Sequence, residues 1–483
     1  MLPAGIRPRL IAIRGPVPDN DRDERIFRQS KADCLDGRVW RQSRSDTVDD
    51  TQGSKRHRSN VDRRQFLRRT AAASTLFALP TIIPASALGR DGAVAPSERI
   101  TLGGIGIRNR GGYVLDFMLQ QPDVQFLAVA DVRADRRGAI KEKVEQRQGP
   151  GVDTYRDFRE LLERDDIDTV LIATGDRWHA PASILAAQAG KDVYSEKPCA
   201  ISIELTQRLA ETMRSTGRIF QAGTQRRNVP NFLGAARLAW DGHLGQIHTV
   251  HASIYELVDR HDWLPAQPAP DKEVIDWEMW LGPAPWRPFN QAYVDGGWRG
   301  FHDFDSGAKL LDWGAHTADL CQWALRKDGT MPVTYEPLDV AGDNVIECTY
   351  ADGVKLVMRR GGWMGLGTCP VRYEGDEGWV ETGDSGRTAV SDERLRAQLP
   401  APPDDPGISP RWHVRDFFDC VKTRQQPACN PDVMESSHIL CHAAAIAWIL
   451  QRKLTFDPAT HSFVDDEPAN RLRARAMREP WIF

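Results

Sequence analysis

The chain has 483 residues, and its 63 Lys and Arg against 67 Asp and Glu give a formal net charge of −4. This length exceeds what one ordinary hydrophobic core holds, so we expect two folded domains. The slight negative charge offers no basic field for nucleic acid, which excludes nucleic-acid binding as an expected function.

Residues 1–60 are rich in Arg, Asp and Ser and have no apolar periodicity, which predicts a disordered extension. Residues 61–96 contain the pair Arg63-Arg64, then a short apolar stretch over 70–83 and the small residues Ala85-Ser86-Ala87. This order is typical of a twin-arginine signal peptide and linker, and predicts a periplasmic or otherwise exported protein.

The apolar stretch of this segment is too short to span a bilayer, so no stable membrane insertion is expected. An export signal normally lies at the start of translation. One interpretation of residues 1–60 is therefore a misassigned start, with Val61 as the initiator.

The next segment, 97–225, has the pattern of a Rossmann dinucleotide-binding domain. A strand from Ile100 enters a glycine-rich turn, and a helix is expected over 113–120. Gly106 and Gly111 take the first and third glycine positions, where the backbone must approach a pyrophosphate. Arg108 occupies the middle position, so either its side chain swings out toward phosphate or the turn is wider than usual.

Asp131 ends the following strand, 25 residues beyond Gly106. A carboxylate at this position can accept hydrogen bonds from the adenine ribose hydroxyls, which favours NAD as the cofactor. Arg133 and Arg136 follow closely and could hold a 2′-phosphate, so NADP remains open.

Two further strand ends carry candidate site residues. The expected strand over 168–174 leads into a loop with Thr174, Trp178 and His179, at the sheet edge that lines a cofactor crevice. The next strand ends in Glu196-Lys197-Pro198. Lysine at such a strand end can hydrogen-bond and polarise a substrate hydroxyl, and Pro198 ends the strand ladder.

The second half, 226–483, shows alternating residues with Asp-Gly turns, which predicts a large, mainly antiparallel sheet with flanking helices. One face of this sheet is expected to bury a subunit contact in a homo-oligomer. The expected helices over 411–422 and 435–451 would return to the Rossmann domain. The tryptophan-rich segment 259–304 is expected to be functional, its rings either stacking on sugars or packing the loop down.

The pattern Asp312-x-x-x-His316-x-x-Asp319 places two carboxylates and an imidazole on one helical face. An aspartate beside a histidine orients the ring and raises its basicity, as a general base requires. The helix alone gives too few ligands for a metal. The eight cysteines lack C-x-x-C or C-x-x-H spacing, so neither a metal site nor a disulfide framework is expected.

These motifs together resemble the glucose-fructose oxidoreductase/inositol dehydrogenase (Gfo/Idh/MocA) family over residues 99–483, and its exported twin-arginine members most of all. The resemblance implies catalytic roles for Lys197, His316 and Asp312, with Asp312 orienting His316. It further implies that Thr174 and Trp178 approach the nicotinamide, His179 approaches its ribose, and Gln225 and Arg226 face the active site. The remaining cofactor-binding candidates are Gly106, Arg108, Gly111, Asp131, Arg133 and Glu196.

The resemblance favours an NAD(P)-dependent oxidoreductase acting on a hydroxyl of a sugar, polyol or glycoside. Because an exported protein could not replace a nucleotide lost outside the cytoplasm, we further expect the cofactor to be tightly bound in a closed redox cycle. A redox-neutral glycoside hydrolase or lyase, acting by oxidation, elimination and re-reduction, is the alternative. A sugar-binding protein with an inactive site is disfavoured, because Glu196, Lys197, Asp312 and His316 are all present.

Overall fold

The computed structural model describes residues 94–340, 343–401 and 409–481. The extension and the twin-arginine segment predicted over 1–96 lie almost entirely outside these residues. The first domain holds a six-stranded sheet in the order β3-β2-β1-β4-β5-β6, and every neighbouring pair is parallel. This is the expected Rossmann topology.

The first domain alternates strands and helices after a short turn, η3 (Pro96–Glu98). In chain order its elements are β1 (Ile100–Ile105), α3 (Asn109–Met118), β2 (Val124–Ala130), α4 (Ala134–Gln148), β3 (Asp153–Tyr155), α5 (Phe158–Leu162), β4 (Thr169–Ile172), α6 (Asp176–Gln188), β5 (Asp192–Ser195), α7 (Ile203–Thr216) and β6 (Phe220–Ala222). Helix α3 begins at Asn109, earlier than expected. Gly111 and Gly112, which the sequence pattern places in the glycine-rich loop, are part of the first helical turn.

The second domain is built on a nine-stranded sheet in the order β13-β12-β11-β7-β10-β9-β8-β14-β15. Only β7 and β10 pair in parallel, so the sheet is mainly antiparallel, as predicted. Its strands are β7 (Ile247–Ile254), β8 (Thr334–Val340), β9 (Asp343–Thr349), β10 (Lys355–Arg360), β11 (Val371–Gly375), β12 (Gly378–Thr382), β13 (Thr388–Val390), β14 (Leu454–Asp457) and β15 (Ser462–Phe463).

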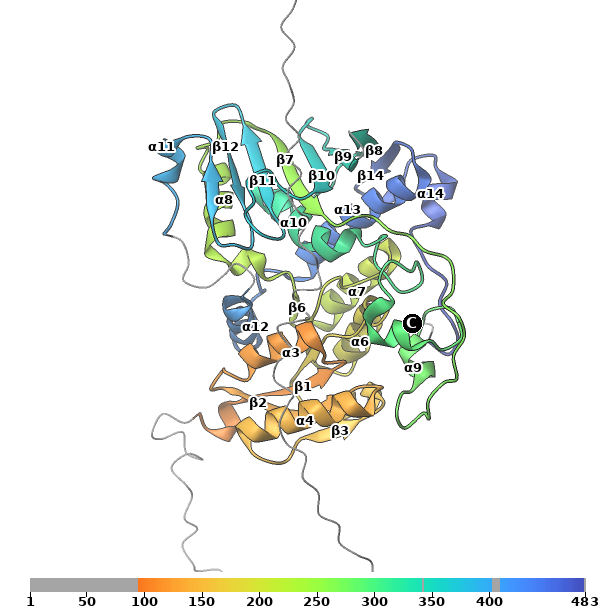
Figure 1. Ribbon diagram of the computed structural model, residues 1–483. Coiled ribbons are helices and arrows are strands. Elements are labelled where there is room, and N and C mark those ends of the chain that lie inside the picture. The colour runs from red at the N-terminus through yellow and green to blue at the C-terminus, as the bar shows by residue number, and fades with distance from the viewer. Residues whose placement is uncertain (1–93, 341–342, 402–408, 482–483) are drawn as a thin grey trace, which may run out of the picture. The chain divides into compact units, whose positions relative to one another are not determined.

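The helices of this domain are η4 (Gln225–Asn228), α8 (Pro230–Trp240), α9 (Trp277–Leu281), η5 (Tyr293–Gly297), α10 (Leu310–Ala324), α11 (Glu393–Arg396), α12 (Arg411–Thr423), α13 (Pro431–Leu450) and α14 (Glu467–Arg471). Some of them, including α8, α10 and α13, pack on the sheet, and α12 reaches back to the Rossmann domain. Helix α10 packs on β7, while α12 lies beside α3 and shares its apolar cluster (Figure 1). The predicted return of the C-terminal helices is therefore present.

Helix α13 is long and apolar enough to cross a bilayer, and it is the single such helix in the described part of the chain. Its most apolar window has a mean hydropathy of 1.4, and 72% of that window is buried inside the protein. It packs between α7 and α10, so its apolar character belongs to the core of a folded domain.

The long segment between β7 and α10 has an aromatic core of its own. Trp280 and Trp298 are buried with Tyr293 and Phe301, and the rings of Trp277 and Trp280 stack at 4.7 Å between centroids. Most of the tryptophans in this segment therefore pack the loop down.

Candidate active site

The turn between β1 and α3 is shaped for close backbone approach. Gly106 has φ +69, and a Cβ there would lie 2.4 Å from Thr174 Cγ2. A Cβ on Gly111 would lie 2.6 Å from Ala173 Cβ, so this glycine lets α3 pack directly on the sheet. No side chain caps the N-terminus of α3, so its first backbone N–H groups are available to an anion such as a pyrophosphate.

Arg108 directs its guanidinium away from the turn. Its Nη1 donates to Val294 O at 3.4 Å, and Arg136 Nη2 donates to the same oxygen at 3.1 Å. Arg133 pairs with Asp135 and, through Nη1, with Asp295 at 3.1 Å. All three arginines therefore tie the Rossmann edge to the segment around η5.

Asp131 has the environment of a ribose ligand. It is buried directly after β2, and its Oδ1 accepts from Arg133 N at 2.9 Å. Its Oδ2 is buried without a hydrogen-bond partner among the described residues, and burial raises the pKa of its carboxyl group. A buried acceptor without a donor is costly. The hydroxyls of an adenine ribose would satisfy this oxygen, so the residues present fit a dinucleotide.

The three candidate residues after β4, Thr174, Trp178 and His179, have different surroundings. Thr174 packs against Gly106, in the turn. Trp178 is buried edge-on between Phe158 and Trp481, and its Nε1 donates to Met279 O at 2.8 Å. Its ring therefore packs the domain, a role that the resemblance did not indicate.

Three buried histidines fix the backbone that follows Lys197. His179 Nδ1 bonds Pro198 O at 2.6 Å, His438 Nε2 accepts from Cys199 N at 3.0 Å, and His442 Nε2 bonds Ala200 O at 3.1 Å. Burial lowers the pKa of His179 to about 4 and that of His438 to about 3, so both remain neutral. A neutral His438 is required, because its Nε2 must accept the hydrogen bond that Cys199 N–H donates.

Lys197 reaches across to the second domain. Its Nζ donates to the backbone oxygen of Asp312 at 2.5 Å, which links the end of β5 to the first turn of α10. Glu196 is buried beside Gly223 and forms an ion pair with Arg110 at 3.4 Å. Two cations therefore lie at the end of β5: Arg110, which is paired with Glu196, and Lys197 itself.

His316 lies buried on α10, and its Nδ1 has no hydrogen-bond partner in the described part of the chain. Burial and the charges of Arg226, Lys197 and Arg110 hold its pKa well below the usual range. The expectation that Asp312 raises the basicity of His316 is therefore wrong in direction, because burial has the largest effect on the pKa of this ring and three cations lower it further. The carboxylate of Asp312 instead lies 3.9 Å from Arg299 Nε.

The segment after β6 contributes two buried arginines. Arg226 forms a bidentate pair with Asp384 at 2.8 and 2.6 Å, and its Nη1 is buried without a partner within the described ranges. Arg227 pairs with Asp319 at 2.6 Å, which assigns Asp319 to an interior ion pair rather than to His316. The preceding residue, Gln225, is also buried, in η4.

Two buried carboxyl groups that the sequence analysis did not single out, those of Asp176 and Asp305, interact with Asp312. Burial and the charge of Asp312 raise the pKa of Asp176 to about 6, and the same two causes raise that of Asp305 well above its usual range. Asp176 begins α6 and Asp305 precedes α10, so this proximity depends on tertiary structure. A carboxyl group that titrates near pH 6 can exchange a proton with a neighbouring site.

Comparison with known proteins gives two family matches. Residues 100–224 match the profile described as "Oxidoreductase family, NAD-binding Rossmann fold", and residues 249–483 match "Oxidoreductase family, C-terminal alpha/beta domain". The chain therefore carries an NAD-binding domain joined to the second domain of the same family.

Among curated relatives, a "Glycosyl hydrolase family 109 protein" of Saccharopolyspora erythraea is 32% identical over 154 residues, which are 31% of this chain and 34% of the relative. An "Alpha-N-acetylgalactosaminidase" of Shewanella oneidensis is 32% identical over 175 residues, which are 32% of this chain and 38% of the relative. The matches thus span little more than a third of these relatives.

Solved structures share the fold over most of the described chain. GenD2 from gentamicin A biosynthesis, in complex with NAD, gives a TM-score of 0.55 at 20% identity, covering 76% of this chain and 98% of that one. An aldose-aldose oxidoreductase from Caulobacter crescentus, complexed with glycerol, gives 0.53 at 17% identity, covering 74% and 100%.

Proposed function

Because the chain belongs to the Gfo/Idh/MocA family of oxidoreductases, we propose that it oxidises a hydroxyl group of a sugar, polyol or glycoside with NAD. One observation carries the proposal: the buried His316, with an unpaired ring nitrogen, lies among the cations Lys197, Arg226 and Arg110. A neutral imidazole accepts a hydroxyl proton, and cations stabilise the alkoxide that results. The carbohydrate assignment is supported by the names of the relatives and by the exposed pair Trp263 and Trp286.

In this reaction His316 accepts the proton of the substrate hydroxyl. Lys197 Nζ and the unpaired Nη1 of Arg226 stabilise the negative charge that develops on the oxygen. The hydride that leaves the carbinol carbon would be accepted by NAD when it is bound. The residues positioned to hold it are Asp131, at the ribose, and the N-terminus of α3, at the pyrophosphate.

We prefer NAD to NADP. The unpaired oxygen of Asp131 offers an acceptor for a ribose hydroxyl and would oppose a 2′-phosphate, and Arg133 is already paired with Asp135 and Asp295. The second arginine that could hold a 2′-phosphate, Arg136, already donates a hydrogen bond to Val294 O.

The redox-neutral cleavage of a glycoside is the second candidate. It is supported by the name of the Shewanella oneidensis relative and by the carboxyl groups of Asp176 and Asp305, which interact with Asp312, the residue that Lys197 contacts. Elimination and re-addition need proton transfers beyond that of the first oxidation. A carboxyl group with a pKa of about 6, such as that of Asp176, can supply one.

We also propose export by the twin-arginine pathway and a homo-oligomer formed through the nine-stranded sheet. The first is supported by Arg63-Arg64 and the residues after them. The second is supported by the exposed Trp363 and Met364, which follow β10. Cell fractionation of the Arg63→Lys/Arg64→Lys variant tests export, and light scattering of the purified protein tests assembly.

The deciding experiment incubates the purified protein with monosaccharides, disaccharides and aryl glycosides, including an aryl α-N-acetylgalactosaminide. NADH absorbance and released product are followed in the same reaction. Accumulating NADH supports net oxidation, whereas released sugar without net NADH supports redox-neutral cleavage. A protein that binds no NAD and shows neither activity contradicts both.

Variants tie either activity to the proposed site. Lys197→Ala and His316→Ala should each lower turnover by about 100-fold or more while NAD affinity stays nearly unchanged. His248→Ala is the matched control, because His248 is exposed on β7 and bonds only its neighbour Thr249 among the described residues. Wild-type turnover in Lys197→Ala or His316→Ala would show that the site is misassigned.

A further inference from the structure

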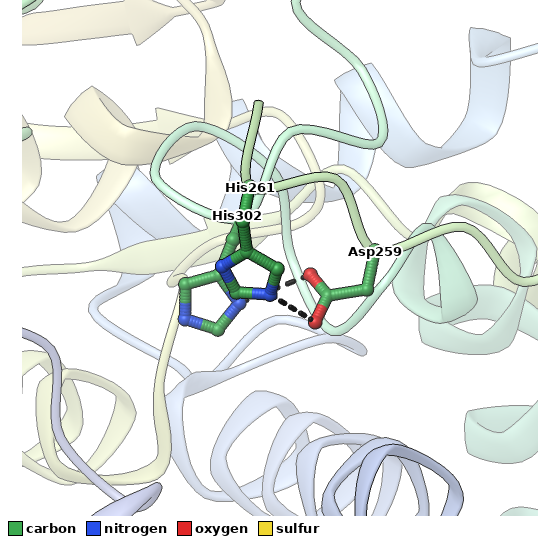
Figure 2. A group of neighbouring side chains, drawn as sticks. All are labelled: Asp259, His261 and His302. Carbon is green, nitrogen blue, oxygen red and sulfur yellow. Dashed lines mark hydrogen bonds and ion pairs between the residues drawn. The ribbon is translucent and has the colours of Figure 1, made fainter. Parts of the chain in front are cut away.

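Outside the proposed active site, a carboxylate and two imidazoles gather on the long loop before α10. His261 Nε2 lies 3.0 Å from Asp259 Oδ2, and His302 Nδ1 lies 3.0 Å from Asp259 Oδ1. One ligand atom from each of the three lies within 4.8 Å of the others. Figure 2 shows the two rings on the same side of the Asp259 carboxylate, with centroids 4.7 Å apart.

The backbone holds these three residues in place. Arg260 and Phe301 form a parallel β-bridge, in which Arg260 N donates to Gly300 O at 2.7 Å and His302 N donates to Arg260 O at 2.9 Å. The guanidinium of Arg260 covers the Phe301 ring at 4.1 Å. Since side chains alternate along extended chains, the residues flanking Arg260 and Phe301 project to the opposite face, where the cluster lies.

We propose that Asp259, His261 and His302 bind one divalent transition-metal ion, and that Zn²⁺ is the ion they suit best. Two imidazole nitrogens and one carboxylate oxygen are a ligand set for metals of intermediate softness, rather than for Mg²⁺ or Ca²⁺. Three protein ligands leave a fourth tetrahedral position for water or another small ligand. The side chain of His261 is 67% exposed, which gives an ion a route into the site.

The surroundings fit this assignment. Arg475 Nη1 donates to the backbone oxygen of His302, and to that of Asp305 at 2.7 Å, which fixes the chain on the C-terminal side of the site. Local spacing does not reveal this site, because His302 lies 41 residues beyond His261.

The site is joined to the first turn of α10 through short hydrogen bonds. Val258 N donates to Ala308 O at 3.0 Å, and Asp305 accepts from Gly300 N at 2.9 Å and from Lys309 N at 2.6 Å. Arg299, next to the bridge, lies near Asp312. A bound ion would therefore clamp the loop that precedes the catalytic helix, and its role is to position rather than to react.

Metal content and thermal stability test the proposal independently of any enzymatic activity. The full chain is stripped with a chelator and titrated with Zn²⁺, and with Mg²⁺ for comparison, by calorimetry and thermal unfolding. We expect one Zn²⁺ per chain, a rise in Tm with Zn²⁺, and no rise with Mg²⁺. The assignment is overturned if the wild-type protein binds no Zn²⁺, or if Mg²⁺ raises its Tm as much as Zn²⁺ does.

His261→Ala is the decisive variant, because His261 is exposed and its loss should leave the fold intact. Changes to the partners of metal ligands already cost roughly 10- to 100-fold in affinity, so loss of a ligand should cost at least that. His302→Ala should behave alike, and His248→Ala should bind as wild type. Unchanged Zn²⁺ affinity in His261→Ala and His302→Ala would place the ion elsewhere, for example at cysteines.

Discussion

His316 determines how activity should depend on pH. A general base must be unprotonated, and burial with three nearby cations keeps the pKa of His316 well below its usual value. Activity is lost as pH falls through that pKa, so kcat/KM should hold its plateau through pH 6.5 and decline only at distinctly lower pH. A pH profile of kcat/KM measures this. An acid limb centred near pH 6.5 would mean that the cations do not act on His316 as the structure indicates.

The second residue-level prediction concerns Asp131. Replacing it with Asn keeps an acceptor for Arg133 N but substitutes an amide donor for the unpaired Oδ2. Hydrogen bonds to charged groups contribute about 1.5–3 kcal/mol, so NAD affinity should fall by at least about tenfold. Titration of NAD by fluorescence checks this, with Tm as the control for folding. An unchanged NAD titration would remove Asp131 from the ribose.

At the level of elements, the contact between α3 and the sheet can be tested with two adjacent glycines. A Cβ on Gly111 meets Ala173 Cβ at 2.6 Å, whereas a Cβ on Gly112 meets only Lys143 Nζ, at 4.0 Å. Gly111→Ala should therefore cost about 1–3 kcal/mol by overpacking and should weaken NAD binding. Gly112→Ala should leave NAD binding intact and stabilise the helix by up to about 1 kcal/mol. Equal Tm values for the two variants would contradict this packing.

The same elements explain what could be predicted from the sequence. The strand, turn and helix around Gly106 and Gly111, the carboxylate of Asp131 and the helical face of His316 are local patterns, and the structure has each of them. The histidines that hold 198–200 come from α6 and α13, and Asp176 and Asp305 meet only when both domains are folded. Their roles depend on contacts between distant segments, which no local spacing encodes.

Asp312 shows the limit of local reasoning more sharply. Its spacing from His316 on α10 is the one expected, yet its backbone oxygen accepts from Lys197 and its carboxylate lies 3.9 Å from Arg299 Nε. The pKa of His316 is lowered chiefly by burial and then by Arg226, Lys197 and Arg110, which reach it from three other segments. A helical repeat predicts which side chains share a face, but not which neighbours dominate their electrostatics.

For the molecule as a whole, the proposed export makes a prediction about the cofactor. The twin-arginine pathway carries folded proteins, and NAD is available in the cytoplasm, so the protein should fold around NAD and cross with it. Outside the cytoplasm a lost or reduced cofactor could not be exchanged, which favours tight retention and the return of each hydride to substrate, product or a second sugar. Denaturing the purified protein without added nucleotide should release near-stoichiometric NAD(H). An empty protein that needs excess NAD for turnover would contradict the closed cycle.

Helix α13 bears on which route across a membrane this chain could take. In the folded protein its apolar residues face α7 and α10. A translocon that threads unfolded chains would instead meet twenty largely apolar residues, Pro431–Leu450, after most of the polypeptide had passed. Such a segment can act as a stop-transfer sequence and leave the enzyme stranded in the bilayer with its last strands on the wrong side. Folding before transport hides that segment, so the proposed export requires that this helix be packed in the core before the chain crosses the membrane.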